Sequence, residues 1–258
     1  MFETIFYQPV LNLLIFLYNI VPGNDLGVAI VLLTIIIKLA LFPLSKKAIE
    51  SQKGLQEIQP EIEAIKKEHK KDREALGKAT LELYKRKKIN PFSSCLPLLV
   101  QLPFLFAVFK VFRNGFGEGS LDLVYSFIAR PEHINTLSLG VFELSAPHNV
   151  FLAAAAGIAL YFQTKMMMAR KPAPKVPVKT DKPGQEDMMA MMNKQMLYVM
   201  PVFTVFISYS FPSGLAMYWF LTTLLTIVQQ HYLFKNDKVK VKNSDTEMEI
   251  LPADKEKK

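Results

Sequence analysis

The sequence predicts an all-α polytopic membrane protein with five transmembrane helices, an interfacial N-terminal helix and a cytoplasmic helical hairpin. Half of its 258 residues are hydrophobic. They fall into blocks of about 18 residues, the length of helix that crosses a hydrocarbon core of roughly 30 Å. The charged residues lie between these blocks, so the apolar surface is expected to face lipid and neighbouring helices.

The first apolar segment, residues 4–21, is interrupted by polar residues and a proline: Gln8, Pro9, Asn12 and Asn19. A signal anchor is one interpretation, but no basic region precedes the segment and no small-residue cleavage site follows it. We favour a helix in the membrane interface. Four aromatic residues would then lie at headgroup depth: Phe6, Tyr7, Phe16 and Tyr18. Residues 1–25 are thus expected to form an extracytoplasmic helix and turn.

Residues 26–45 form the first spanning unit, with the span at 27–44 and Pro43 near its exit. Residues 46–90 are strongly charged, and their apolar residues recur at spacings of three and four. The first set is Leu55, Ile58, Ile62 and Ile65, and the second includes Leu76, Thr80 and Leu83. Each set makes a narrow stripe, which is typical of two helices packed as an antiparallel hairpin. We expect the joint near residues 69–72.

Residues 91–232 contain the other four spans and their loops. We expect these spans at about 95–112, 149–166, 196–211 and 213–231. The short connection between the last two forces them to be antiparallel, and the run Ala153–Ala156 in the third span permits close helix contact. A stretch rich in Pro and Lys within 167–195, and the polar tail at 233–258, are expected to be disordered.

The distribution of Lys and Arg predicts the orientation. Residues 46–90 hold thirteen, residues 165–195 hold seven and residues 235–258 hold seven, whereas the loop 114–148 holds only Arg130. Because basic loops stay on the cytoplasmic side, the N-terminus is expected outside and the C-terminus inside. The predicted location is the bacterial plasma (inner) membrane. The net charge of +8 is therefore assigned to loop orientation and not to nucleic-acid binding.

Lys38 is the most unusual residue within a span. Placing a lysine near a helix centre costs about 2.5–3.5 kcal/mol, and such residues usually face a polar cavity. The alternative is that its long side chain reaches back toward water. Thr34 lies one turn earlier on the same face. Gln101, between Pro97 and Pro103, either lines the same cavity or makes an interhelical hydrogen bond worth roughly 0.6 kcal/mol.

The sequence lacks the residue patterns that several classes of function require. The four histidines share no ligand spacing, Cys95 is the single cysteine, and no GxxxxGK[ST] run is present. The five spans contain no acidic residue, which argues against a proton relay or a cation-coupled carrier. We see no nucleophile–base pair either. We therefore expect a protein that is not an enzyme and that needs no cofactor or metal.

Methionine is concentrated in one predicted cytoplasmic loop, which holds seven of the twelve between positions 166 and 192. Flexible, polarizable thioethers suit the binding of varied apolar segments. Alternatively, these side chains dip into the membrane interface as extensions of the spans. The candidates for substrate or partner contact are Met166, Met167, Met188 and Met189.

Four stretches together resemble the YidC family of membrane protein insertases, over almost the whole chain. They are IVLLTIIIKLALFPLSKKA at 30–48, LQEIQPEI at 55–62, LELYKRKKINPFSSCLPLLVQLPFLFAVF at 81–109 and MPVFTVFISYSFPSGLAMYWFLTTLLTIVQQ at 200–230. The most specific motifs are the Asn-Pro, Cys-Leu-Pro and Gln-x-Pro series and the Phe-Pro-Ser-Gly-Leu turn.

The resemblance implies five spans around a hydrophilic groove that is closed outward and open to the cytosol and lipid. It implies an insertase that handles nascent membrane proteins without hydrolysing nucleotide, with the ribosome and the Sec translocon as candidate partners. The family's groove charge is an arginine, and the matching residue here is Lys38, so bidentate contacts are lost. We expect Thr34 and Gln101 to line the groove, and Trp219 to line the substrate path or to pack as an anchor.

Two other functions remain open from the sequence. An assembly scaffold for membrane complexes would need the same lipid-facing groove as an insertase. A small anion channel or carrier, with Lys38 as the selecting charge, should show paired half-helices or an inverted repeat, and we see neither.

Overall fold

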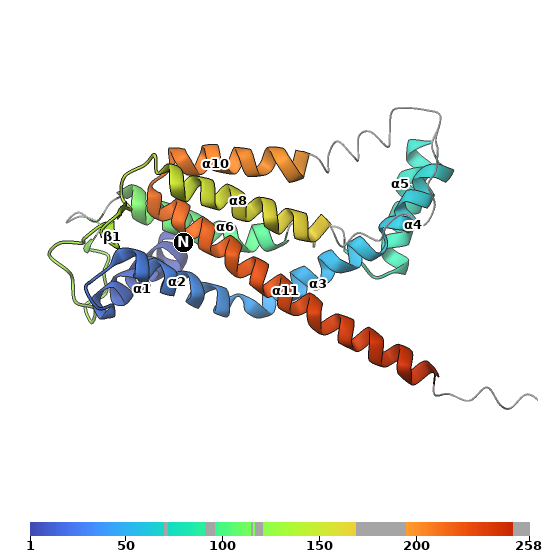
Figure 1. Cartoon of the computed structure of the whole chain (residues 1–258), viewed down its shortest axis with the longest axis horizontal. Helices are drawn as coiled ribbons and strands as arrows, with labels where there is room; N and C mark the ends of the chain where they lie inside the picture. The colour runs from blue at the N-terminus through green and yellow to red at the C-terminus, as the bar shows by residue number, and fades with distance from the viewer. Residues whose placement is uncertain (70–71, 91–95, 115, 117–120, 169–194, 250–258) are drawn as a thin grey trace, which may run out of the picture.

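The structure is a computed structural model that describes residues 1–69, 72–90, 96–114, 116, 121–168 and 195–249. At positions 56, 67, 73, 96–98 and 234–249 only the backbone is described. Long helices form an elongated bundle (Figure 1). Residues 121–148 lie at one end, which we call the loop end. The helices α4 (Gln59–Glu68) and α5 (Arg73–Arg86) lie at the other, which we call the hairpin end.

The N-terminal segment is helical, as predicted. A π-helical turn, η1 (Glu3–Tyr7), leads into α1 (Gln8–Ile20), and the turn that follows has positive φ at Gly23 and Asn24. Tyr7 and Tyr18 pack in the main hydrophobic core with α2 and α6, so these two aromatic residues face the inside of the protein. Their depth at the membrane headgroups stays a prediction. Phe16 is exposed.

The predicted first span is two helices and not one. Asp25 caps α2 (Leu26–Ala40), and α3 (Phe42–Glu57) continues at an angle of 67°. Pro43 explains the break, since it has no N–H to donate to the carbonyl one turn earlier and its ring crowds that turn. The helix α3 therefore runs through the boundary that we predicted at residue 45.

The charged segment begins within α3, and from residue 59 it forms two helices that contact each other, α4 and α5. Asp72 caps α5 by accepting hydrogen bonds from Glu74 N and Ala75 N. Ile58, Ile62 and Leu83 form a small separate core between them. These are the residues of the predicted stripes. A hairpin with so small a core is held mainly by this one apolar seam.

The bundle consists of α2, α6 (Leu96–Asn114), α8 (Val150–Met168), α10 (Met200–Ser210) and α11 (Ser213–Glu249), with the π-helical turn η3 (Gln195–Val199) leading into α10. α11 contacts α2, α6, α8 and α10 and is the central helix. α8 and α10 are in close contact at Gly157, where an added Cβ would lie 2.9 Å from the carbonyl oxygen of Pro201. Ala153 and Ala156 are fully buried, as expected for small residues at a close contact.

Two regions differ from the sequence prediction. The loop contains a short antiparallel pair, β1 (Leu137–Ser138) and β2 (Phe142–Glu143), which we did not predict. The helix α11 continues to Glu249, although we expected disorder from residue 233. The chain has no Gly or Pro between Gly214 and Pro252, so no residue there favours a helix end. The predicted disorder in 167–195 falls almost wholly outside the described residues.

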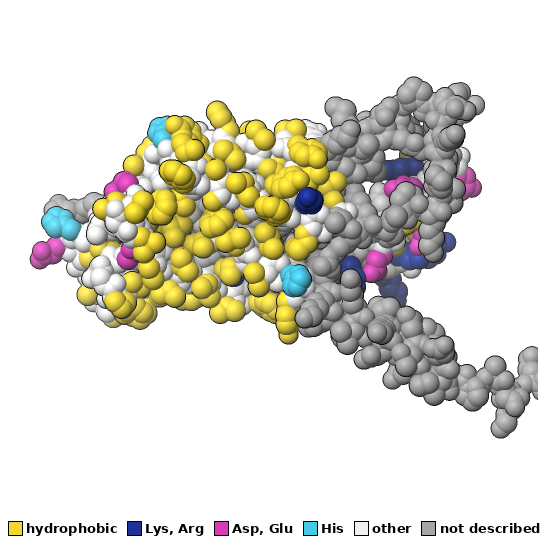
Figure 2. Space-filling view, in the orientation of Figure 1, with side chains coloured by type: hydrophobic (Ala, Val, Ile, Leu, Met, Phe, Trp, Pro, Cys, Tyr) yellow, Lys and Arg dark blue, Asp and Glu magenta, His cyan; other side chains and the backbone are white. Residues whose placement is uncertain are grey.

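Exposed hydrophobic side chains cover the body of the bundle, and charged side chains gather mostly toward its two ends (Figure 2). The exposed set includes Phe151, Ile158, Phe162, Val202, Phe203 and Phe206. Among the described residues, α8 alone has the length and hydropathy of a span, and α2 with α3 qualifies as one bent span. The exposed apolar belt is typical of a surface that faces lipid. The count of five spans stays a prediction.

Candidate functional site: a polar stripe on α11

Lys38 lies in the last turn of α2, and its Nζ donates a hydrogen bond to Thr226 Oγ1 of α11 at 2.8 Å. The Thr226 hydroxyl in turn donates to the carbonyl oxygen of Thr222 at 2.7 Å. Lys38 is half-buried and lies about 18 Å along the helix from Leu26. The ammonium group of Lys38 is therefore held against α11, near the end of α2 that is farther from the loop end.

Gln101 contacts the same helix at a different level. Its Nε2 donates a hydrogen bond to the hydroxyl of Tyr218, which is buried. Tyr218, Thr222 and Thr226 are spaced by four residues, so they lie along one face of α11. Lys38 and Gln101 contact this face at residues eight apart, or about 12 Å along the axis. The structure thus supports the interhelical hydrogen bond that we kept as the alternative for Gln101.

Thr34 and Trp219 are less engaged than predicted. Thr34 lies on the Lys38 face of α2 but is buried, and its hydroxyl donates to the carbonyl oxygen of Ile30 in its own helix at 2.6 Å. Trp219 is half-buried, and its backbone carbonyl accepts a hydrogen bond from Thr223. The roles predicted for both side chains stay predictions.

Two glutamines continue the polar face of α11 beyond Lys38. Gln229 and Gln230 are buried, with exposed fractions of 9% and 2%. Within the described part of the chain, Gln229 Nε2 and Gln230 Oε1 have no hydrogen-bond partner. Buried polar atoms are nearly always paired, with protein or with water. The polar stripe on α11 therefore has side-chain atoms without hydrogen-bond partners among the described residues, one turn beyond Thr226, the residue that binds Lys38.

The two methionine candidates that the structure describes lie toward the hairpin end. Met166 and Met167 lie in the last turn of α8 and are half-buried. Met167 is in contact with α3, because the Gln52 Nε2 donates to its sulfur at 3.7 Å. Met188 and Met189 lie outside the described residues.

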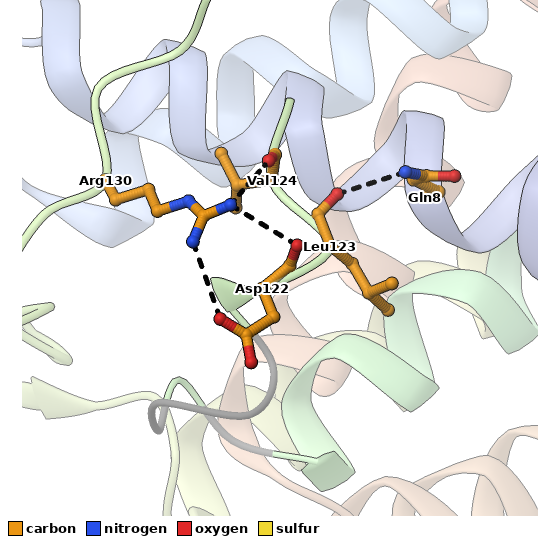
Figure 3. Close-up of polar contacts among 5 residues, drawn as sticks. All are labelled: Gln8, Asp122, Leu123, Val124 and Arg130. Atoms are coloured by element: carbon orange, nitrogen blue, oxygen red, sulfur yellow. Dashed lines mark hydrogen bonds and ion pairs between the residues drawn. The ribbon is translucent and has the colours of Figure 1, made fainter. Parts of the chain in front are cut away.

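The loop end has a different character, because polar side chains of α1 bind the backbone of residues 121–130. Asn12 is buried, and its Oδ1 accepts from Tyr125 N at 2.6 Å while its Nδ2 donates to the Leu123 carbonyl at 3.0 Å. The Gln8 side chain donates to the same carbonyl, and Arg130 closes the loop through Asp122 and Val124 (Figure 3). The polar residues that interrupt the first apolar segment thus hold the loop in place.

Asp25 fixes the other half of the loop. Its carboxylate accepts four hydrogen bonds, from Gly27 N, Val28 N, Ser138 Oγ and Leu139 N, at 2.7 to 3.1 Å. Burial raises the pKa of Asp25, but these hydrogen bonds together outweigh it and lower the pKa below the ordinary value of 3.8. Gly27 permits this contact, since a Cβ there would lie 2.0 Å from Ser138 Oγ.

Sequence reasoning missed the residues of α11 that receive Lys38 and Gln101. Thr226 lies 188 positions from Lys38, and Tyr218 lies 117 positions from Gln101. A signal was present, because polar residues recur four positions apart at 222, 226 and 230, with Thr223 and Gln229 next to them, in a block that is apolar elsewhere. Such a stripe in a predicted span indicates a polar face that must be turned away from lipid.

Comparisons with known proteins agree on one family. Residues 16–241 match the family model described as 60Kd inner membrane protein. A membrane protein insertase YidC of Fusobacterium nucleatum is 33% identical over 212 residues, which are 82% of this chain and 87% of that protein. A YidC of Pelobacter propionicus is 36% identical over 234 residues, or 90% of this chain and 39% of that protein. The chain thus spans most of the first relative and about two-fifths of the second.

A solved structure gives the same result. The crystal structure of an active YidC insertase with its first transmembrane domain resolved matches with a TM-score of 0.56 and 27% sequence identity. The match covers 90% of this chain and 46% of the other.

Proposed function

Because the chain belongs to the 60Kd inner membrane protein family, to which its YidC insertase relatives point, we propose that it inserts and folds small membrane proteins without nucleotide hydrolysis. The observation that carries the mechanism is the Lys38–Thr226 contact on the polar stripe of α11. A cation with nearby unpaired amides is an environment that accepts polar or acidic segments of a substrate at a depth where lipid would reject them.

In the proposed mechanism, the polar tail of a substrate first enters from the hairpin end. Its carboxylates and amides bind Lys38 and the glutamines beyond it, which replaces hydrogen bonds to water that the tail loses on leaving the cytosol. Thr226 holds the ammonium group in position until the tail arrives. The apolar segment then moves out between helices into lipid, and the burial of its apolar surface drives the step at about 25 cal/mol per Å².

The orientation that we propose places the hairpin end in the cytosol and the loop end outside. The concentration of Lys and Arg in 46–90, 165–195 and 235–258 supports it. Five spans, with the N-terminus outside and the C-terminus inside, are part of the same proposal. Nascent membrane proteins are the proposed substrates. The methionines Met166 and Met167 in the last turn of α8, with Met188 and Met189 further along the chain, are the proposed first contacts.

A charge series at Lys38 tests the mechanism. A bacterial strain depleted of its own insertase is complemented with wild type, Lys38→Arg, Lys38→Ala or Lys38→Glu, and the insertion of small substrates with acidic or neutral tails is measured. We expect Lys38→Ala to lower insertion of the acidic substrate about tenfold, the value of one hydrogen bond to a charged group. We expect Lys38→Glu to lower it further and Lys38→Arg to retain it.

Lys78→Ala, on the exposed face of α5, is the matched control for loss of a lysine, because its pair with Glu74 lies on the surface. If Lys38→Ala and Lys38→Glu insert the acidic substrate as well as wild type, the charged-groove mechanism is wrong. Protease protection of a substrate added to liposomes that contain only this protein separates insertion from a scaffold role, since a scaffold leaves the substrate unprotected. An anion leak without protection would indicate the channel alternative.

A further inference from the structure

A hollow of about 520 Å³ lies beside the last two turns of α6, at the loop end of the bundle. It is lined by Phe2, Phe106, Phe109, Lys110, Arg113 and Asn114. The Phe106 ring is 55% exposed and Phe2 is 38% exposed, so the apolar wall of the hollow opens onto the surface of the bundle. None of these residues belongs to the polar stripe on α11.

Two cations share this hollow. Lys110 and Arg113 are three residues apart and lie on one face of α6. The Arg113 guanidinium lies over the Phe109 ring at 5.8 Å from its centroid, and the Lys110 ammonium lies 4.9 Å from the centroid of the Tyr7 ring. Aromatic faces hold a cation without using its N–H donors.

The two cations differ in their partners. Lys110 forms an ion pair with Glu3 of the N-terminal turn. In the described part of the chain, no carboxylate lies within ion-pair distance of Arg113. The hollow therefore contains one compensated cation and one that retains its charge for a ligand, with the Asn114 side chain beside them.

The helix dipole accounts for part of this arrangement. Arg113 lies in the last turn of α6, where the backbone carbonyls favour a cation by about 0.3–1 kcal/mol. That effect does not account for a second cation one turn further in. Nor does it account for a hollow with an apolar wall at the level where a helix leaves the hydrocarbon.

We propose that this hollow binds the phosphate group of an anionic membrane lipid. The end of a span is the depth of lipid phosphates, Arg113 can donate two parallel N–H bonds to phosphate oxygens, and the Phe2 and Phe106 rings can contact the acyl chains. Lys110 joins when the phosphate displaces Glu3. The inference rests on the chain being a membrane protein and is independent of the insertion mechanism.

The experiment titrates the purified full chain with phosphatidylglycerol, with phosphatidylcholine of the same acyl chains and with inorganic phosphate, and counts bound lipid by native mass spectrometry. Each surface cation contributes roughly fivefold in lipid affinity, so we expect Lys110→Gln with Arg113→Gln to weaken phosphatidylglycerol binding about 25-fold. Arg130→Gln is the matched control, because its guanidinium is already bonded to Asp122 and the loop backbone, and should change binding less than about twofold.

A gain of affinity makes the test independent of folding defects. Glu3→Gln removes the carboxylate that competes for Lys110, and should tighten phosphatidylglycerol binding by up to about fivefold. Unchanged phosphatidylglycerol affinity in the double variant would overturn the proposal. Equal binding of the two lipids by wild type, or displacement of phosphatidylglycerol by inorganic phosphate alone, would overturn the assignment to an anionic lipid.

Discussion

The loop end and the hairpin end of the bundle treat their buried amides in opposite ways. At the loop end, Asn12 uses both its oxygen and its nitrogen on the loop backbone, and Asp25 receives four hydrogen bonds. Toward the hairpin end, Gln229 and Gln230 each carry a buried polar atom without a partner within the described residues. A satisfied network rigidifies a structure, whereas an unsatisfied one costs free energy that a ligand or water can recover. The comparison indicates a closed scaffold at one end and a binding surface at the other.

The largest expected effect on stability comes from removing the Asn12 amide, which binds the loop backbone at the loop end. Asn12→Leu leaves the half-buried Tyr125 N–H without its Asn12 acceptor and the Leu123 carbonyl with only the exposed bond from Gln8 among these side chains, and should lower the free energy of unfolding by about 1–3 kcal/mol. Thermal or denaturant unfolding in detergent measures it. Gln8→Leu is the control, because its bond to the same carbonyl is exposed and 3.2 Å long, and should cost under about 1 kcal/mol. Equal effects of the two substitutions would contradict the comparison.

Low pH should destabilise the loop end, because it protonates the Asp25 carboxylate. Its pKa is lower in the folded than in the unfolded protein, so the carboxylate contributes stability that is fully present above the unfolded value of 3.8. That contribution is lost as pH falls below this value through the folded pKa. We expect the unfolding midpoint of wild type to fall more steeply than that of Asp25→Asn below about pH 4. Parallel curves for the two proteins would exclude this role.

Removing the buried amide at Gln230 should not destabilise the protein, in contrast to removing the amide at Asn12. Gln230→Leu removes a buried carbonyl that has no partner among the described residues, and should leave stability unchanged or raise it by about 1 kcal/mol while insertion of polar-tailed substrates slows. Thermal unfolding and protease protection measure the two effects on one preparation. Gln101→Leu is the contrasting variant, because it breaks the bond to Tyr218 and should destabilise the protein. A destabilised Gln230→Leu would show that this amide has a structural partner.

The smallest effect is expected on the surface of the hairpin itself. Lys87 pairs with Glu61 at 2.7 Å, and both side chains are about 40% exposed. Lys87→Gln should change the free energy of unfolding by no more than about 0.5 kcal/mol. Ile62→Ala, in the small core of the hairpin, is the comparison that should cost more. A loss above 1 kcal/mol on Lys87→Gln would mean that surface charges hold the hairpin.

The sequence predicts the helices of this bundle well, because long apolar blocks and stripes at spacings of three and four are local signals. It also predicts that Lys38 needs a polar environment. It does not predict which residue supplies that environment, since Thr226 is distant in the chain and the polar residues around it indicate a polar face of a helix but not the residue that this face contacts. In the sequence, Asn12 and Asn19 only interrupt an apolar segment, whereas in the structure both side chains donate to loop carbonyls. The structural role of these asparagines depends on partners that are distant in the sequence, and a local sequence pattern does not identify them.

The bend at Pro43 changes the electrostatic setting of Lys38. Had α2 and α3 formed one straight span, the lysine would lie in the interior of a helix, where every neighbouring carbonyl is used by the backbone ladder. Because α2 ends at Ala40, Lys38 lies instead in a final turn, among carbonyls that carry the negative end of the helix dipole. The proline that separates α2 from α3 thus creates a local negative potential at the position where α2 carries its lysine.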